Sequence, residues 1–107
     1  MQPSTTPGTR VIEETSVKHE PPFHLILLDD NHHTYEYVII MLGSIFGYAV
    51  DKAFAIACVV DSQGQAVLMT GPYEEMRRRQ EKIHAFGADP RMPESAGSMS
   101  AVIEPVP

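Results

Sequence analysis

Two different hydrophobic patterns follow one another between residues 23 and 47. Residues 23–28, FHLILL, are almost continuously apolar, which predicts a short strand at the centre of a sheet. After a polar turn, Thr34 is placed to cap a helix that Gly47 ends. The apolar residues of this helix recur at a spacing that predicts one core face: Tyr35, Val38, Ile39, Leu42 and Phe46.

The later segments alternate between helical and extended patterns. Residues from about 51 to about 61 are apolar nearly all round, so we expect a helix covered on every side, ended by Gln63-Gly64. Residues 65–70 predict a second strand. Pro72 then opens a third helix that Gly87 ends, and residues 99–103 predict a third strand.

The resulting order βααβαβ predicts an α+β domain over residues 23–107. We expect a two-layer α/β sandwich, in which three helices lie on one side of a three-stranded antiparallel sheet. Residues 1–22 are rich in Ser, Thr, Pro and charged side chains and show no apolar period. They are therefore expected to form a disordered N-terminal arm.

Composition narrows the class of partner. The 107 residues suffice for one domain, and the formal charge of −6 argues against a general binder of nucleic acid or of an anionic membrane. A single cysteine allows neither an internal disulfide nor a cysteine metal cluster. The chain has no apolar leader and no run long enough to span a bilayer, so a cytoplasmic location is expected.

The densest polar cluster follows the first strand. It consists of Asp29, Asp30, Asn31, His32 and His33. Three interpretations are open: a turn whose side chains bind the local backbone, a metal site, or an Asp-His acid–base pair. Adjacent residues seldom point at one ion, and no nucleophile motif or phosphate loop accompanies the pair. We therefore expect no enzyme activity, no bound metal and no cofactor. Asp61, which ends an apolar helix, either faces a cation or lies exposed.

Several motifs in order resemble the ClpS adaptor family, the N-degron readers that deliver substrates to a Clp AAA+ unfoldase. They are PPFHLILLDDNHHTYEYV, Gly47-Tyr48 followed by Val50, the Gln63-Gly64 turn, GPYEEM and the closing MSAVIEP. The resemblance implies an adaptor that binds the free α-amino group and the side chain of a substrate's N-terminal residue. It also implies a ClpA- or ClpC-type unfoldase as the partner, and a monomer.

The resemblance assigns roles to individual residues. The family's ammonium-binding positions are filled here by Asp29, Asp30 and Asp61, and the polar gate position by His33. Its side-chain cavity corresponds to Tyr35, Ala57, Val60 and Met99, and its unfoldase-docking face falls partly on Glu74 and Arg79.

Five of these positions depart from the family's usual residues. Asp29 stands in place of Asn, Asp61 in place of His and His33 in place of Thr, while Tyr35 and Ala57 stand in place of Met. The three carboxylates should attract an ammonium more strongly and repel one another in the empty site. A rival interpretation is a protein-docking module, like the ribosomal stalk C-terminal domain of similar fold, that lacks a terminus-binding pocket.

Overall fold

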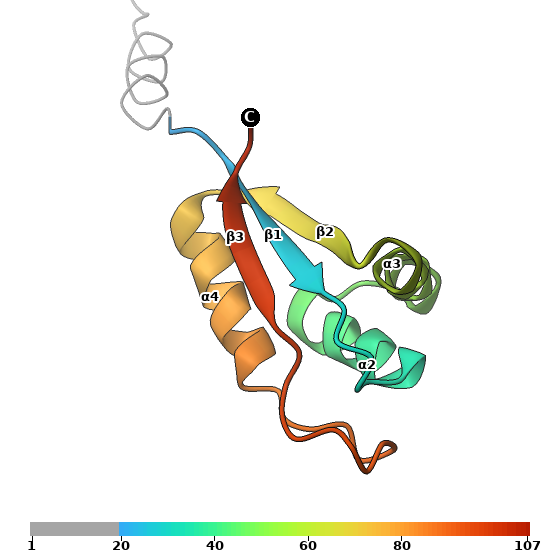
Figure 1. The fold of residues 1–107 in the computed structure, drawn as a ribbon. Coiled ribbons are helices and arrows are strands. Elements are labelled where there is room, and N and C mark those ends of the chain that lie inside the picture. Colours follow the sequence, from blue (N-terminus) through green and yellow to red (C-terminus); the bar gives the residue numbers. More distant parts are fainter. Residues whose placement is uncertain (1–19) are drawn as a thin grey trace, which may run out of the picture.

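The computed structural model describes residues 20–107. The arm expected over residues 1–22 therefore lies outside the described residues, apart from its last three. The elements are β1 (Phe23–Leu28), α2 (Tyr35–Phe46), α3 (Val50–Gln63), β2 (Gln65–Gly71), α4 (Tyr73–His84) and β3 (Ala101–Pro105). The predicted order βααβαβ and the α+β fold class are confirmed (Figure 1).

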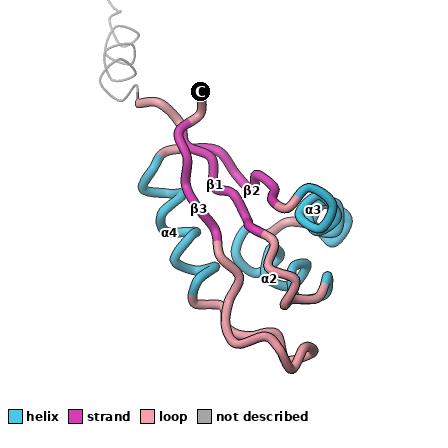
Figure 2. Tube along the Cα trace, viewed as in Figure 1, coloured by secondary structure: helices cyan, strands magenta, loops and turns pink. Residues whose placement is uncertain are grey.

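The sheet has the strand order β2-β1-β3, and both pairs are antiparallel. The continuously apolar strand β1 is therefore the central strand, as predicted, and its Leu25 and Leu27 are fully buried. Figure 2 shows the three strands side by side, with the helices gathered behind them and beyond the edge formed by β2. No helix among the described residues has the length and apolar character needed to cross a bilayer.

Helix α2 is capped as predicted, but its buried face is rotated. The Oγ1 atom of Thr34 accepts a hydrogen bond from the Tyr37 N–H at 3.1 Å, and Gly47 ends the helix at φ 72°. The buried residues are Tyr37, Val38, Met41 and Leu42, whereas the side chain of Tyr35 is 37% exposed. Tyr35 leaves the core because its ring extends towards α3, where Phe54 lies.

Helix α3 contradicts the expectation of a helix covered on every side. Only Ala53, Ala57 and Val60 are buried, while Cys58 is partly buried and Phe54 is 48% exposed. The two small alanines on the buried face allow close packing against the rest of the core. Away from this buried face, the helix leaves Val50, Phe54 and Val59 largely exposed.

The chain after α4 differs from the prediction at both ends. Helix α4 ends at His84 and not at Gly87, and β3 begins at Ala101, two residues later than expected. The Nε2 atom of His84 accepts a hydrogen bond from the Ala101 N–H at 3.0 Å, which joins these two ends. Met99 precedes the strand and is buried.

Candidate functional site

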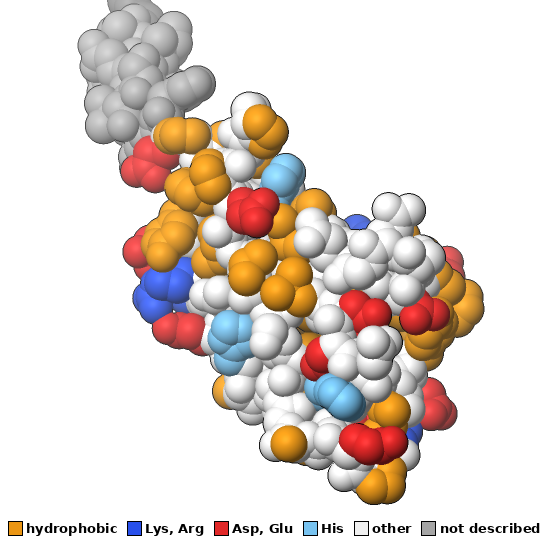
Figure 3. All heavy atoms as spheres, viewed as in Figure 1, with side chains coloured by type: hydrophobic (Ala, Val, Ile, Leu, Met, Phe, Trp, Pro, Cys, Tyr) orange, Lys and Arg blue, Asp and Glu red, His pale blue; other side chains and the backbone are white. Residues whose placement is uncertain are grey.

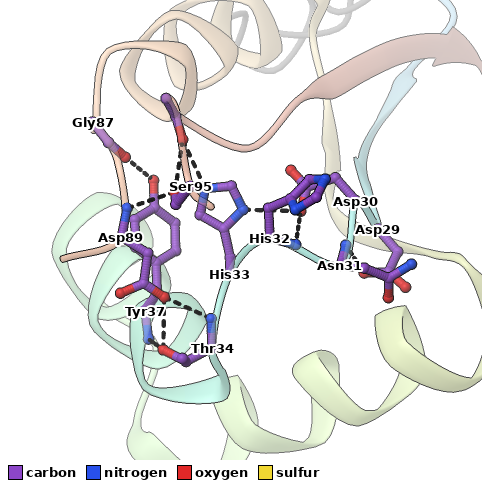
Figure 4. Close-up of polar contacts among 11 residues, drawn as sticks. Asp29, Asp30, Asn31, His32, His33, Thr34, Tyr37, Gly87, Asp89 and Ser95 are labelled. Carbon is purple, nitrogen blue, oxygen red and sulfur yellow. Dashed lines mark hydrogen bonds and ion pairs between the residues drawn. The ribbon is translucent and has the colours of Figure 1, made fainter. Parts of the chain in front are cut away.

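The polar cluster after β1 folds into a turn that binds its own backbone. Asn31 has a φ of 62°, in the left-handed region that Asn tolerates better than most residues. The Asn31 N–H donates to Asp29 Oδ1 at 3.2 Å, and the His32 N–H donates to Asp30 Oδ1 at 2.9 Å. Figure 4 shows Asp29 beside Asn31, with Asp30 turned towards the two histidines. Local backbone binding, the first of the three interpretations, is therefore present.

Two backbone hydrogen bonds join this turn to distant segments. The Asp29 N–H donates to the carbonyl of Gly64, just past the end of α3, at 3.0 Å. The Leu28 N–H donates to the carbonyl of Ser100 at 3.0 Å. Together they hold the end of β1 against the last turn of α3, which carries Asp61, and against the segment that carries Met99.

A pocket of about 160 Å³ opens where these segments meet. Its lining residues are Asp29, Asn31, His33, Tyr35, Val38, Ala57, Val60, Asp61 and Met99. The four apolar residues of this lining, Val38, Ala57, Val60 and Met99, are each only 3–4% exposed. Asp29 is half-buried and Asp61 is exposed. The pocket therefore combines a buried apolar lining with carboxylates that solvent reaches.

The structure brings together every predicted pocket residue except Asp30, which does not line this pocket. Sequence reasoning missed Asn31 and Val38. Val38 could have been predicted to line the pocket because it follows Tyr35 by three residues, and residues at i and i+3 share one side of a helix. Asn31 could have been predicted because it lies directly after the paired carboxylates.

Asp30 instead contacts the side chain of His33. Asp30 Oδ1 lies 2.9 Å from His33 Nδ1, and the opposite ring nitrogen, Nε2, lies 2.7 Å from the carbonyl oxygen of Gly97. The His33 side chain is only 3% exposed. Since both ring nitrogens face oxygen acceptors, both contacts are hydrogen bonds only when each nitrogen carries a proton. The ring thus links the turn after β1 to the segment that precedes β3.

Tyr35 and Asp61 form a second contact, across the pocket. The Tyr35 hydroxyl donates to Asp61 Oδ2 at 2.7 Å. This hydrogen bond, together with desolvation and the charge of Asp61, raises the pKa of Tyr35 to about 12. The hydroxyl therefore keeps its proton at neutral pH and remains a donor to the carboxylate.

A buried aspartate that sequence reasoning missed fixes the start of α2. Asp89 is 1% exposed, and its Oδ2 accepts hydrogen bonds from the Thr34 N–H at 2.6 Å and the Thr34 hydroxyl at 2.8 Å. Its Oδ1 accepts from the Arg91 N–H at 2.9 Å. Burial alone would raise the pKa of Asp89, but the hydrogen bonds from Thr34 and Arg91 outweigh it and lower the pKa to about 2. An ionised Asp89 thereby holds Thr34, the residue between His33 and Tyr35.

The two predicted docking residues lie on α4 in different surroundings. Glu74 is exposed and accepts a hydrogen bond from Arg77 Nε at 3.2 Å. Arg79 is half-buried, and its Nη1 donates to the Ile45 carbonyl near the end of α2 at 2.7 Å. Its guanidinium also lies over the ring of Phe46, 5.3 Å from the centroid. The guanidinium of Arg79 thus binds residues of the domain itself, at the end of α2.

Neither a metal-binding cluster nor a second pocket adds a candidate site among the described residues. Within residues 20–107, no group of three or more His, Cys, Asp or Glu side chains is arranged to hold a metal ion. A larger hollow of about 270 Å³ lies between α2 and the loop after α4. Its lining residues are Tyr37, Ile40, Phe86, Ala88, Pro90 and Arg91. None of the predicted site residues lines it, and it contains no carboxylate.

Residues 18–93 match the family model of the ATP-dependent Clp protease adaptor protein ClpS. The ATP-dependent Clp protease adapter protein ClpS of Streptomyces coelicolor is 35% identical over 81 residues, which cover 74% of this chain and 84% of the relative. The protein of the same name from Rhodococcus jostii is 28% identical over 85 residues, covering 79% and 76%.

A solved structure has the same fold. It is that of Agrobacterium tumefaciens ClpS2 bound to L-phenylalaninamide, with a TM-score of 0.69 and 17% sequence identity. The match covers 80% of this chain and 98% of that chain.

Proposed function

This chain belongs to the ClpS family of ATP-dependent Clp protease adaptor proteins, and we propose that its pocket binds the N-terminal residue of a substrate. Asp29 and Asp61 would hold the free α-amino group, while the apolar lining would hold the first side chain. The bound substrate is then delivered to a ClpA- or ClpC-type AAA+ unfoldase. The observation that carries this proposal is the pocket that places two carboxylates beside four buried apolar residues.

The chemistry of a chain terminus fits this arrangement. A free N-terminus carries a positive charge and three N–H donors, which no internal residue offers through its backbone. Each charge-assisted hydrogen bond to a carboxylate contributes about 1.5–3 kcal/mol, and burial of a Leu- or Phe-sized side chain adds about 1.5–3 kcal/mol. After the cost of ordering the peptide, these contributions support roughly micromolar binding.

The hydrogen bonds that the carboxylates already make determine which of their oxygens can bind an ammonium. Asp61 Oδ2 already accepts from Tyr35, so the ammonium would use Asp61 Oδ1 and the free lone pairs of Asp29. Asp30 remains in the proposed ammonium site through its negative charge, although its Oδ1 contacts His33. His33, Tyr35, Ala57, Val60 and Met99 remain the proposed side-chain pocket.

The ligand of the structural relative supports the same chemistry. ClpS2 of Agrobacterium tumefaciens was solved with L-phenylalaninamide, a molecule with a free α-amino group and a blocked carboxyl group. Those two features also distinguish the first residue of a protein chain. We propose the same class of ligand for this chain.

We propose that Glu74 and Arg79 contribute to the unfoldase-docking face, that the adaptor acts as a monomer and that it works in the cytoplasm. Capture and delivery require no bond to be made or broken, so no catalytic residue is assigned.

Acetylation of the substrate N-terminus tests the proposal. Fluorescence anisotropy would compare the protein's affinity for a labelled peptide beginning with Phe and for the same peptide after N-terminal acetylation. We expect the free peptide to bind and the acetylated one to lose binding, because acetylation removes the charge and two donors. Equal affinity for both would overturn the proposal. Under the rival docking-module interpretation, Asp30→Ala would leave binding of the partner intact.

A further inference from the structure

The outer side of α3 carries an apolar face that the core does not use. Val50 is 69% exposed and Phe54 is 48% exposed, and the partly buried Cys58 follows at the same spacing. Residues four apart share one side of a helix, so the three side chains form a continuous stripe. Together with the adjoining ring of Tyr35, we call this stripe the α3 apolar face. Figure 3 shows hydrophobic side chains at the outer edge of α3, near acidic ones.

This face is continuous with the pocket. The rings of Tyr35 and Phe54 meet edge to face with their centroids 5.6 Å apart. Tyr35 also lines the pocket and donates its hydroxyl hydrogen bond to Asp61. Asp61 follows Cys58 by three residues and therefore extends the same side of α3 to the pocket. One aromatic ring thus belongs both to the pocket and to the exposed face.

We propose that the α3 apolar face binds an apolar side chain at the second or third residue of the substrate. The inference rests on the proposed function, because a first residue held in the pocket fixes where the next residues lie. An adaptor of this kind would read the residues that follow the N-terminus as well as the N-terminus itself.

The spacing of Phe54 and Asp61 along α3 agrees with the second or third residue of a substrate as the occupant of the α3 apolar face. Phe54 and Asp61 are seven residues apart on α3, which corresponds to about 10 Å along the helix axis. Two to three residues of extended peptide span roughly 7–10 Å. A substrate whose α-amino group lies at Asp61 therefore brings its second and third residues alongside Tyr35 and Phe54.

On the side of the turn after β1, the described residues that line the pocket are polar. The turn after β1 presents Asp29 and Asn31, whose polar groups would be desolvated by an apolar side chain without compensation. Apolar side chains that follow the first residue thus gain contact area on the α3 side and lose hydration on the β1 side. This difference selects the α3 apolar face as the path of the substrate.

Peptides that differ only after the first residue test the proposal. Three peptides would begin Phe-Gly-Gly, Phe-Leu-Gly and Phe-Gly-Leu, and would share one Gly/Ser tail with a fluorophore at its C-terminal end. Fluorescence anisotropy would measure their affinity for the full chain and for two variants. The variants are Phe54→Ser and, as a matched control, Val59→Ser. Val59 is 43% exposed on the same helix but lies about 140° around the axis from Phe54.

We expect at least one Leu-containing peptide to bind the unmodified protein about three- to tenfold more tightly than Phe-Gly-Gly. Phe54→Ser should remove most of this gain and leave Phe-Gly-Gly binding nearly unchanged, whereas Val59→Ser should preserve the gain. If the three peptides bind the unmodified protein equally, or if the gain survives in Phe54→Ser, the inference is wrong while the proposed function stands. If even Phe-Gly-Gly fails to bind, both are overturned.

Discussion

The hydroxyl of Tyr35 donates a 2.7 Å hydrogen bond to Asp61 and so joins the first residue of α2 to the last turn of α3. The contact fixes one oxygen of a carboxylate that is otherwise exposed to solvent. An exposed Asp side chain samples several rotamers, and restricting them before the ligand arrives lowers the entropy cost of binding. Tyr35 is therefore a positioning residue for the proposed ammonium site.

Tyr35→Phe removes this hydrogen bond and keeps the ring. We expect the affinity for a free N-terminus to fall about three- to tenfold, because Asp61 is no longer held in place. Tyr48→Phe is the control, since it removes another 2.7 Å tyrosine hydrogen bond, to the Leu68 carbonyl, away from the pocket. Anisotropy titrations would compare the two variants. Equal affinities in both would contradict the positioning role.

Asp61→Asn removes one charge from the pocket with little change of shape. The affinity for a free N-terminal peptide should fall about ten- to hundredfold, because a charge-assisted hydrogen bond is lost. Asp51→Asn makes the same change of net charge ten residues earlier on α3, about 15 Å away along the axis, and should alter affinity less than about twofold. Similar losses of affinity in both variants would mean that the overall charge of the protein, and not the position of Asp61, determines peptide binding.

Ala57→Met places a longer side chain in the pocket. Ala57 is 3% exposed and lines a volume of about 160 Å³, so the added atoms occupy space needed by a large first side chain. The affinity for a peptide beginning with Phe should fall about tenfold or more. Ala55→Met, at an exposed position of the same helix, should have no effect. Undiminished Phe binding in Ala57→Met would place the first side chain elsewhere.

The depressed pKa of Asp89 predicts a loss of stability in acid. Its folded pKa is about 2, below the 3.8 of an unperturbed Asp side chain. The unfolded chain therefore takes up this proton first as the pH falls. The stabilisation is complete above about pH 4 and is lost progressively between about pH 4 and pH 2.

Urea unfolding at several pH values would measure this loss against the Asp89→Asn variant. At neutral pH we expect the variant to be less stable by about 2–4 kcal/mol, because an amide nitrogen then faces N–H donors. The difference between the two proteins should shrink as the pH falls towards 2. A difference that stays constant with pH would show that the Asp89 charge does not stabilise the fold.

Arg79→Ala should lower the free energy of unfolding by about 1–2 kcal/mol, because the Ile45 carbonyl loses its partner and Phe46 loses the guanidinium above it. Arg78→Ala, at the exposed neighbouring position, should change it by less than about 0.5 kcal/mol. Thermal or urea unfolding of the two variants provides the comparison. An unchanged stability in Arg79→Ala would leave Arg79 free for the proposed docking face.

The sequence predicted best those features that depend on local patterns. The bounds of β1 and α2 follow from a continuous apolar run, a Thr cap and a terminal Gly, and the structure confirms both. The pattern could not show which side of α3 is buried, because nearly every residue there is apolar. The buried side proved to be the one that carries Ala53, Ala57 and Val60.

The site was predictable as a set of residues, but its contacts were not. Family resemblance named most of the lining of the pocket. It did not show that Asp30 contacts His33, or that Tyr35 binds Asp61, because each pair depends on side-chain directions set by the whole fold. Asp89 was missed altogether, since a lone Asp before Pro reads as an ordinary loop residue until its partner, Thr34, is known.

The central position of β1 has a mechanical consequence. Phe23 begins this strand, and the strand is paired antiparallel on both sides, to β2 and to β3. Tension applied at Phe23 would load both ladders in shear, so that many hydrogen bonds resist it at once rather than opening one by one. A motor that pulled from this end would need its highest force to unfold the first strand. The pocket at the far end of that strand would therefore persist until the sheet unfolded.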